Sequence, residues 1–299
     1  MLKYILLIIL VSSVSLANSF DRLVTVHKFN QANKYVEQLV KQKGAKHVLL
    51  VFDDDNTLAT MPQPLGSVGW WDWQMHLLKH NPKSPQLVAH NFHNLLQIQI
   101  LLFDMSRVKL TSVKIPLLLN KWQKQGVTTM IETDRSHGFI SDTNRQLTNV
   151  GLLGAQNKVD FAKHAVVAPN GMTSLPGDFY PCNDKSMRKI AYQSGILFVG
   201  GQNKGKLMIC LLKRLKQSKK YTGILFIDDK LQNDQDFHHA YQPLGKKLDI
   251  YSVHYTKENA KQFHITSSAR LHRQMTVKWQ KIVKVMRLAF AKPNLPIGN

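Results

Sequence analysis

The chain has 299 residues, 43% of them hydrophobic, and 40 Lys and Arg against 19 Asp and Glu give it a formal charge of +21. This composition excludes a disordered chain, and the length suffices for one large core with room for an insertion. The charge favours anionic partners such as phosphorylated molecules, nucleic acid or acidic lipid, although a basic background composition explains it equally well.

Residues 1–17 resemble a secretory signal. Lys3 precedes a short apolar run, and Ser15 and Ala17 stand three residues and one residue before a cleavage point after Ala17. The run is too short for a membrane-spanning helix, although an uncleaved anchor is the alternative. We therefore expect an exported protein, periplasmic or secreted, whose mature domain covers residues 18–299.

Segments with helix and strand patterns alternate along the rest of the chain. Residues 28–43 carry apolar side chains at helical spacing, and Gly44 ends the segment. Short apolar runs rich in β-branched residues then predict strands at 47–52, 127–132, 195–199, 223–227 and 247–253. Continuous apolar strands separated by helical stretches are typical of a parallel sheet covered on both faces. The predicted fold class is therefore α/β.

A long insertion separates the first two of these strands. Residues 61–120 far exceed the dozen residues or so that a crossover needs, so we expect a helical cap over the strand ends. Trp70 and Trp71 lie in this segment and could form a stacking wall for a nucleobase or an aryl group. Packing of the cap onto the core is the alternative for both.

The C-terminal segment predicts a basic helix at about 268–291. It contains no acid after Asn259, and its cations alternate with apolar residues at helical spacing. We expect its apolar face to pack on the domain with its lysines solvated. An anionic membrane surface is the alternative partner.

Polar side chains collect where the predicted strands end. Asp53, Asp54 and Asp55 follow the first strand, Thr133, Asp134 and Arg135 the second, and Asp228 and Asp229 a later one, while Lys204 and Lys206 follow a Gly-rich turn. Carboxyl ends of parallel strands meet at one edge of a sheet, which is where α/β proteins bind ligands. Because residues two apart on an extended segment face the same way, Asp53 and Asp55 can converge while Asp54 is turned aside.

These residue types suit a magnesium site that handles phosphate. Carboxylates of Asp53 and of Asp228 or Asp229 are hard oxygen ligands for Mg²⁺. The hydroxyl of Thr133 and the ammonium of Lys204 could hold the remaining phosphate oxygens. The pattern thus predicts phosphate chemistry at the strand ends.

The motifs resemble those of the haloacid dehalogenase-like (HAD) superfamily. "DDDNTL" is similar to its first motif, "MIETDR" to its second, "NKG" to its third and "LFIDDKLQND" to its fourth, in family order over roughly residues 45–255. The set resembles in particular the secreted class B and class C acid phosphatases, and a little-described branch of exported bacterial HAD-like proteins of unknown function. The resemblance implies a Rossmannoid three-layer sandwich with a small helical cap.

The resemblance also implies roles for the site residues. Asp53 would be the nucleophile, and Asp55 would be the general acid and base, with its backbone carbonyl joining Asp53 and Asp229 around Mg²⁺. Thr133 and Lys204 would anchor the phosphoryl group, with Lys206 as the alternative lysine. Two further residues complete the set, Arg135 for substrate binding and Asp228 for the metal.

Two positions depart from the class C pattern. Asp228 stands where that pattern has Gly, and Asn233 replaces a carboxylate, which puts the outer metal shell in doubt. The two cysteines, Cys182 and Cys210, match no metal-site spacing, and the sequence leaves open whether they pair.

The expected function is an exported Mg²⁺-dependent phosphomonoester hydrolase that acts through a phosphoaspartate on a phosphorylated small molecule, a nucleotide being one option. A phosphotransferase or a narrower nucleotidase is the alternative among enzymes. From another class, the alternative is a non-catalytic module whose basic C-terminal helix binds membrane, nucleic acid or a host factor. No obligate protein partner is inferred.

Overall fold

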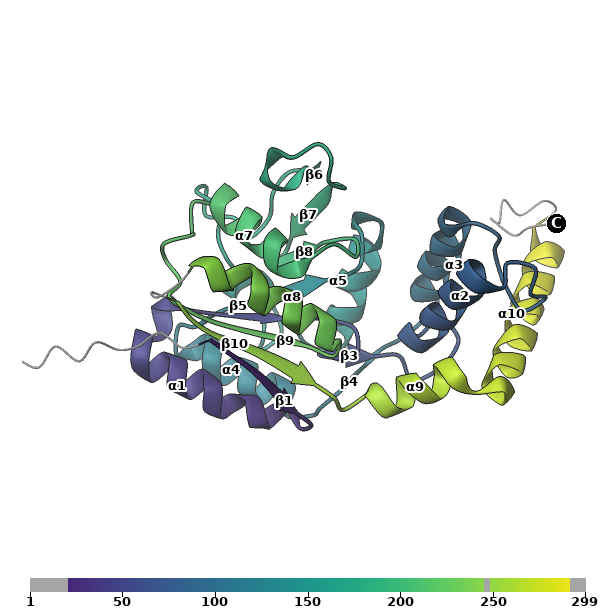
Figure 1. Cartoon of the computed structure of the whole chain (residues 1–299), viewed down its shortest axis with the longest axis horizontal. Coiled ribbons are helices and arrows are strands. Elements are labelled where there is room, and N and C mark those ends of the chain that lie inside the picture. Colours follow the sequence, from purple (N-terminus) through teal and green to yellow (C-terminus); the bar gives the residue numbers. More distant parts are fainter. Residues whose placement is uncertain (1–20, 245–247, 291–299) are drawn as a thin grey trace, which may run out of the picture.

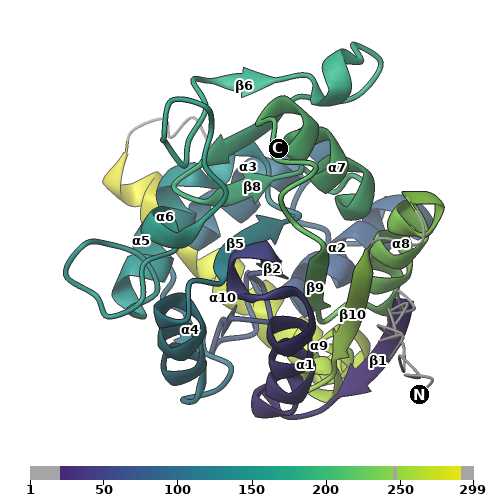
Figure 2. The ribbon, with the colours of Figure 1, turned by 90° about the vertical axis from the view of Figure 1, so that its left-hand side faces the viewer.

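The computed structural model describes residues 21–244 and 248–290, so the expected signal at 1–17 lies outside the described residues. Figures 1 and 2 show a central sheet with strand order β1-β10-β9-β2-β5-β8-β7-β6. The parallel strands are β1 (Asp21–Val26), β10 (Asp249–Tyr255), β9 (Gly223–Asp228), β2 (Val48–Phe52), β5 (Thr128–Thr133) and β8 (Ile196–Phe198). Antiparallel strands β7 (Ile190–Gln193) and β6 (Asp178–Phe179) complete one edge. The predicted α/β class with a mostly parallel sheet is confirmed.

Helices cover both faces of this sheet (Figure 2). One face carries α1 (Asn33–Lys43), α4 (Ile115–Lys124), α5 (Ile140–Asn149) and the short α6 (Phe161–His164), and the other carries α7 (Lys204–Arg214) and α8 (Leu231–Tyr241). Alternate residues of β2 divide between the two cores: Leu50 and Phe52 pack on the α1 side, and Leu49 and Val51 pack on the α7 side. Burial on both faces is why this strand is apolar without interruption.

Three strands of this sheet, β1, β6 and β7, were absent from the sequence prediction. Strand β1 pairs with β10 at the edge of the sheet, where Leu23 is 38% exposed, so only a short β-branched run marks it. Strand β7 is joined to β8 by Ser194 and Gly195, whose φ angles of 53° and 76° form a two-residue hairpin turn. The strand predicted at 195–199 therefore begins at Ile196.

The predicted cap segment, 61–120, divides between two parts of the molecule. The pair β3 (Ala59–Thr60) and β4 (Lys109–Leu110) closes the insertion, and α2 (Val68–His80) and α3 (Phe92–Asp104) stand apart from the sheet in Figure 1. Helix α4, within the range assigned to the cap, instead packs Ile115, Leu119 and Trp122 on the sheet. Helix α4 packs there because its apolar residues recur at helical spacing on one face, and the sheet buries that face.

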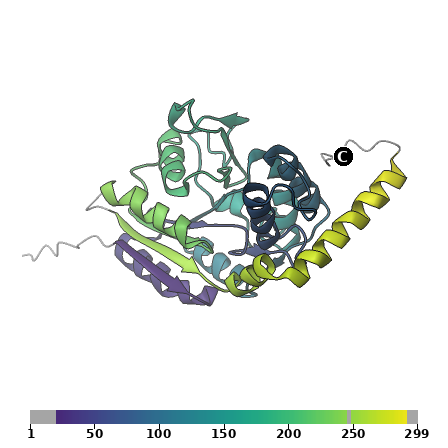
Figure 3. The ribbon, with the colours of Figure 1, turned by 45° about the vertical axis from the view of Figure 1, so that its right-hand side comes forward.

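The two helices that follow the sheet return to the cap. After β10, helices α9 (Asn259–Ser267) and α10 (Ala269–Ala289) pack against α2 and α3, and Figure 3 shows α10 running as a long helix along the outer side of the cap. Trp70, Ile265, Met275 and Trp279 share one buried cluster. In the described ranges, no helix combines the length and the apolar character that crossing a membrane requires.

A disulfide fixes the segment between β6 and β7. Cys182 bonds Cys210 with a Cα–Cα distance of 5.0 Å, which settles the pairing that the sequence left open. The bond ties the turn at Pro181–Asn183 to helix α7. The hairpin edge of the sheet is thus covalently attached to the helix that begins at Lys204.

Candidate functional site

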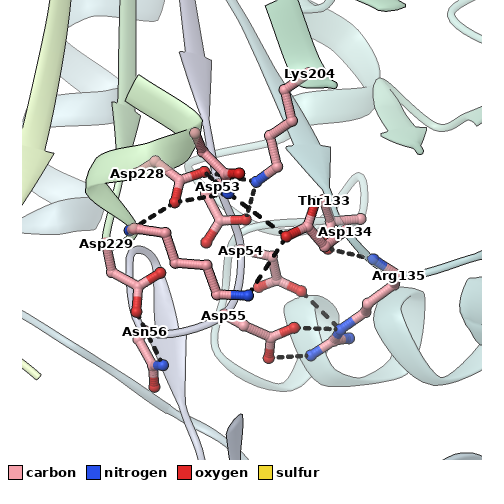
Figure 4. A network of polar contacts seen from close by, with 12 residues as sticks. Asp53, Asp54, Asp55, Asn56, Thr133, Asp134, Arg135, Lys204, Asp228 and Asp229 are labelled. Carbon is pink, nitrogen blue, oxygen red and sulfur yellow. Dashed lines mark hydrogen bonds and ion pairs between the residues drawn. The ribbon is translucent and has the colours of Figure 1, made fainter. Parts of the chain in front are cut away.

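The carboxyl ends of three neighbouring strands form the floor of the site. Asp53 follows β2, Asp134 follows β5, and Asp228 ends β9, and these strands are adjacent in the sheet. The backbone N–H of Asp53 donates to Ile227 O at 2.9 Å, so the backbone of Asp53 is held by the last hydrogen bond between β2 and β9. Figure 4 shows the carboxylates of Asp53 and Asp228 directed toward one ammonium group.

That ammonium group belongs to Lys204, the first residue of α7. Its Nζ lies 2.6 Å from Asp53 Oδ1 and 2.6 Å from Asp228 Oδ2, and its side chain is fully buried. Burial works against its charge, but the carboxylates of Asp228 and Asp53 outweigh this effect and raise the pKa of Lys204 above its ordinary value. Lys206 is exposed, so of the two candidate lysines it is Lys204 that the fold brings to the carboxylates.

Gly205 lets the helix bearing Lys204 approach its neighbour α8. A Cβ at this position would lie 2.7 Å from Ala240 Cβ and 2.7 Å from Phe237 Cα, closer than packed atoms allow. The side chain of Asn203 caps the helix by accepting the N–H of Lys206 at 2.9 Å. Close packing and capping together fix where the lysine enters the site.

Asp53, Asp228 and Asp229 form a cluster of three buried carboxylates. One oxygen from each lies within 4.8 Å of the others. Burial, and then repulsion by Asp228, raises the pKa of Asp229 to about 8, and burial with the neighbouring acids also raises the pKa of Asp53. Asp53 and Asp228 contact the ammonium of Lys204, and the raised pKa values mean that this one cation does not suffice to keep all three carboxylates ionised. This donor set fits Mg²⁺.

Asn56 orients one carboxylate of the cluster through a hydrogen bond. It has a positive φ of 63°, and its Nδ2 donates to Asp229 Oδ2 at 3.1 Å. Its Oδ1 accepts from Gln262 Nε2 at 3.0 Å and from Thr60 Oγ1 at 3.1 Å. Sequence reasoning passed over Asn56 and Gln262, and only the position of Asn56 just after the acidic run hinted at a role.

Arg135 is engaged by the other two acids of the run. Its Nε and Nη2 donate to the two oxygens of Asp55, each at 2.8 Å, and Nη1 donates to Thr143 Oγ1 at 2.8 Å. Nη1 also lies 3.2 Å from Asp54 Oδ2. Asp54 does turn aside from Asp53, and burial raises its pKa to about 6 against the opposing charge of Arg135. The guanidinium that we assigned to substrate is thus occupied by carboxylates at the pocket edge.

The remaining polar groups lie between β5 and α8. Thr133 is fully buried, and its Oγ1 accepts the backbone N–H of Arg135 at 3.3 Å. Asn233 Nδ2 donates to Asp228 Oδ2 at 3.0 Å, and Lys230 Nζ lies 3.5 Å from Asp134 Oδ2. Burial favours the neutral acid, but Lys204 and Lys230 lower the pKa of Asp134 overall. Asn233 is therefore a hydrogen-bond donor to a carboxylate of the cluster.

The two tryptophans assigned to substrate take different positions. Trp71 borders the pocket and contacts Phe92 edge-on, with ring centroids 6.0 Å apart. Trp70 is 1% exposed and packs in the cap core with Trp73, so its predicted substrate contact is wrong. On helix α2, Trp70 and Trp73 are three residues apart and share the buried face. Trp71 is rotated about 100° from Trp70 around the helix axis and therefore reaches the pocket.

A pocket of about 760 Å³ opens above the carboxylates. Its cap wall is largely apolar and includes Trp71, Met75 and Phe92, and its opposite wall comes from the β6–β7 hairpin. Asp53, Asp55, Asp228 and Asp229 line the floor, while Lys204 and Thr133 lie beneath it. The acids therefore face a space large enough for a small molecule.

Residues 25–292 match the family described as "Protein of unknown function (DUF2608)", and the chain belongs to this family. No curated protein matches the sequence. The function must therefore be argued from the site itself.

Proposed function

We propose that the protein is a Mg²⁺-dependent phosphomonoester hydrolase with a HAD-like fold and a phosphoaspartate intermediate. The observation that carries this proposal is Lys204 Nζ, which lies 2.6 Å from both Asp53 and Asp228 at the floor of a large pocket. A nucleophilic carboxylate, a buried cation and a second acid at adjacent strand ends are what phosphoryl transfer to an aspartate requires.

In the first step, an oxygen of Asp53 attacks phosphorus and the bond to the leaving oxygen breaks. Asp55, at the same pocket floor, supplies the proton that the leaving oxygen takes. In the second step, water attacks the acyl phosphate, Asp55 accepts a proton from that water, and inorganic phosphate leaves with Asp53 restored. Lys204 offsets the charge on the phosphoryl oxygens in both steps.

Asp53, Asp228 and Asp229 would hold the Mg²⁺ ion, which supplies positive charge that polarises the phosphoryl group. Arg135 would act as a positioning residue, because both its parallel hydrogen bonds go to Asp55 and fix the orientation of that carboxylate. Asn56 would orient Asp229 in the same way.

We also propose export of the protein to the periplasm or beyond. The Cys182–Cys210 disulfide supports this, because such bonds persist in oxidising compartments. The N-terminal sequence, with its apolar run and small residues before Ala17, agrees with export.

The test compares the wild-type protein with Asp53→Asn on 4-nitrophenyl phosphate, with Mg²⁺ and with EDTA. We expect hydrolysis by the wild type with Mg²⁺ only, and Asp236→Asn, which changes an acid outside the pocket, serves as the matched control. Borohydride treatment during turnover should convert Asp53 to homoserine, detected by mass spectrometry. Equal activity in Asp53→Asn and the wild type, or no activity on a panel of monoesters and nucleotides, would overturn the proposal.

The outer face of α10 supports the second candidate, a module that binds anionic membrane surfaces. Lys281 and Lys284 are exposed there beside Val285 and Leu288, which are 63% and 79% exposed. A cationic face with exposed apolar side chains suits an acidic lipid surface. Cosedimentation with phosphatidylserine vesicles should fall in Lys281→Gln/Lys284→Gln and persist in Lys34→Gln/Lys41→Gln on helix α1, and equal binding by both double variants would reject this candidate.

A further inference from the structure

The pocket is much larger than a phosphoryl group. Its volume of about 760 Å³ extends from the carboxylate floor to a wall made by Trp71, Met75, Phe92 and Leu96 of the cap. Phe92 is 52% exposed, so the wall presents apolar surface to whatever fills the space. A ligand that occupies the pocket therefore carries an apolar body beyond its phosphate.

Arg188 lines the same pocket from the segment between β6 and β7, and Gln202 holds its backbone in place. The side chain of Gln202 accepts the backbone N–H of Arg188 at 3.0 Å and donates to its carbonyl at 3.1 Å. Arg188 Nη2 donates to Gly200 O at 2.7 Å. Residues 200–202 form the turn that leads into Lys204, so Arg188 is attached to the segment that positions the buried lysine.

The disulfide strengthens this attachment. The Cys182–Cys210 bond joins the turn after β6 to the second turn of α7. Gln202 joins Arg188, just before β7, to the segment that precedes α7. The hairpin wall is therefore fastened to α7 at two points. The backbone that carries Arg188 is thus held relative to the helix that begins at Lys204.

Most cations of the pocket are neutralised by acids. The ion pairs, listed by contact, are Lys204 with Asp53 and Asp228, Arg135 with Asp54 and Asp55, Lys230 with Asp134, and Lys189 with Asp178. Within residues 21–244 and 248–290, Arg188 and Lys185 line the same pocket without an acidic side chain in ion-pair contact. Both are exposed, and the guanidinium of Arg188 retains N–H groups beyond the one given to Gly200.

We propose that Arg188, assisted by Lys185, binds a second anionic group of the substrate. The substrate class is then phosphomonoesters whose apolar body carries a further carboxylate or phosphate. This inference rests on the proposed function and adds a specificity-determining residue to it. The apolar body packs on the cap wall, the scissile phosphate lies over Asp53, and the second anion accepts hydrogen bonds from the hairpin. Arg suits this task because its planar fork donates in parallel to two oxygens.

The test uses matched substrates with the wild-type protein and Mg²⁺. Phenyl phosphate, 4-carboxyphenyl phosphate and its uncharged carboxamide differ in the second group alone. Biphenyl analogues test a longer distance between the phosphate and the second anionic group. Analogues with a second phosphate in place of the carboxylate distinguish the two sources of negative charge. We expect KM for the preferred ester with a second anionic group to be about tenfold or more below KM for its carboxamide. A tenfold ratio corresponds to the free energy of a charge-assisted hydrogen bond.

Arg188→Gln should remove this preference, so that the KM of the anionic ester rises more than the KM of the carboxamide. Lys213→Gln, which removes an exposed cation of α7 outside the pocket, is the matched control. Lys185→Gln should give a smaller loss in the same direction, and it keeps the test valid if Arg188→Gln does not fold. Titration calorimetry with a non-hydrolysable carboxylated benzylphosphonate should show the same losses of affinity without turnover.

Two outcomes would overturn the inference while leaving the phosphatase intact. One is hydrolysis of all three esters with equal KM by the wild type, and the other is an equal rise in KM for the anionic ester and its carboxamide in Arg188→Gln. Absence of hydrolysis of every ester would instead reject the proposed function, and this inference with it.

Discussion

Gln262 and Asn56, 206 residues apart in the chain, share a hydrogen bond of 3.0 Å that links helix α9 to the carboxylate floor. The Oε1 atom of Gln262 also accepts the backbone N–H of Gly69 at 2.8 Å, and Asn56 donates to Asp229. Cap helix α2, helix α9 and the proposed metal ligand are thus connected through one buried amide.

Replacing Gln262 should weaken metal binding as well as the fold. Gln262→Leu leaves the N–H of Gly69 without its acceptor and frees one side of Asn56, so we expect a loss of about 1 to 3 kcal/mol in the free energy of unfolding. Mg²⁺ affinity should fall by about tenfold or more, because Asp229 loses part of its support. Urea denaturation and the Mg²⁺ dependence of the melting temperature measure the two effects. Gln274→Leu, an exposed residue of α10, should change neither.

Replacing each of the two candidate lysines by Met should distinguish their roles. Lys204→Met removes the cation between Asp53 and Asp228, and we expect kcat on an aryl phosphate to fall by about 100-fold or more. Lys206→Met, with the same change on an exposed side chain, should stay within about twofold of the wild type. Circular dichroism checks that both variants fold. A larger loss of activity in Lys206→Met than in Lys204→Met would contradict the assignment.

Arg135 should be more important for stability than an exposed arginine. Arg135→Gln leaves two acids without their buried cation, and we expect a loss of about 3 to 5 kcal/mol in the free energy of unfolding. Adding Asp54→Asn should restore part of it, since the buried carboxylate that lost its partner is then neutral. Denaturant titrations measure both, with Arg273→Gln as an exposed control. Equal stability of the single and double variants would argue against charge compensation.

Asp142 should make stability depend on pH between about 4 and 6. Burial, with a hydrogen bond to Asp104 as the next cause, raises its pKa from 3.8 to about 6. In this window the folded protein keeps a proton that the unfolded chain releases, so stability falls as pH rises from about 4 through 6. Asp142→Asn mimics the protonated acid, so the free energy of unfolding of the variant should increase relative to that of the wild type as pH rises from about 4 to 6.

The measurement for Asp142 is the difference in the free energy of unfolding between wild type and variant, taken by urea denaturation at several pH values. Glu37→Gln removes an acid from an exposed ion pair with Lys121 and controls for the change in net charge. A difference between wild type and Asp142→Asn that stays constant from pH 4 to pH 7 would refute the prediction.

The sequence by itself determined the α/β class, the main strands of the sheet and the acids at their ends. Local patterns suffice for these features, because burial on both faces makes a strand such as Val48–Phe52 apolar throughout and because functional side chains follow strand ends. The antiparallel hairpin and the edge strand β1 escaped prediction, since a two-residue turn and a half-exposed edge leave only short signals.

Only the tertiary structure decided which side chains meet. Helical phase turned Trp71 toward the pocket and Trp70 into the cap core, although the two are neighbours in sequence. Likewise, Asn56 with Gln262 and Cys182 with Cys210 are pairs that no local spacing encodes. Such contacts depend on how the sheet, the cap and the C-terminal helices pack together, and this packing is set by the whole buried surface rather than by any one segment.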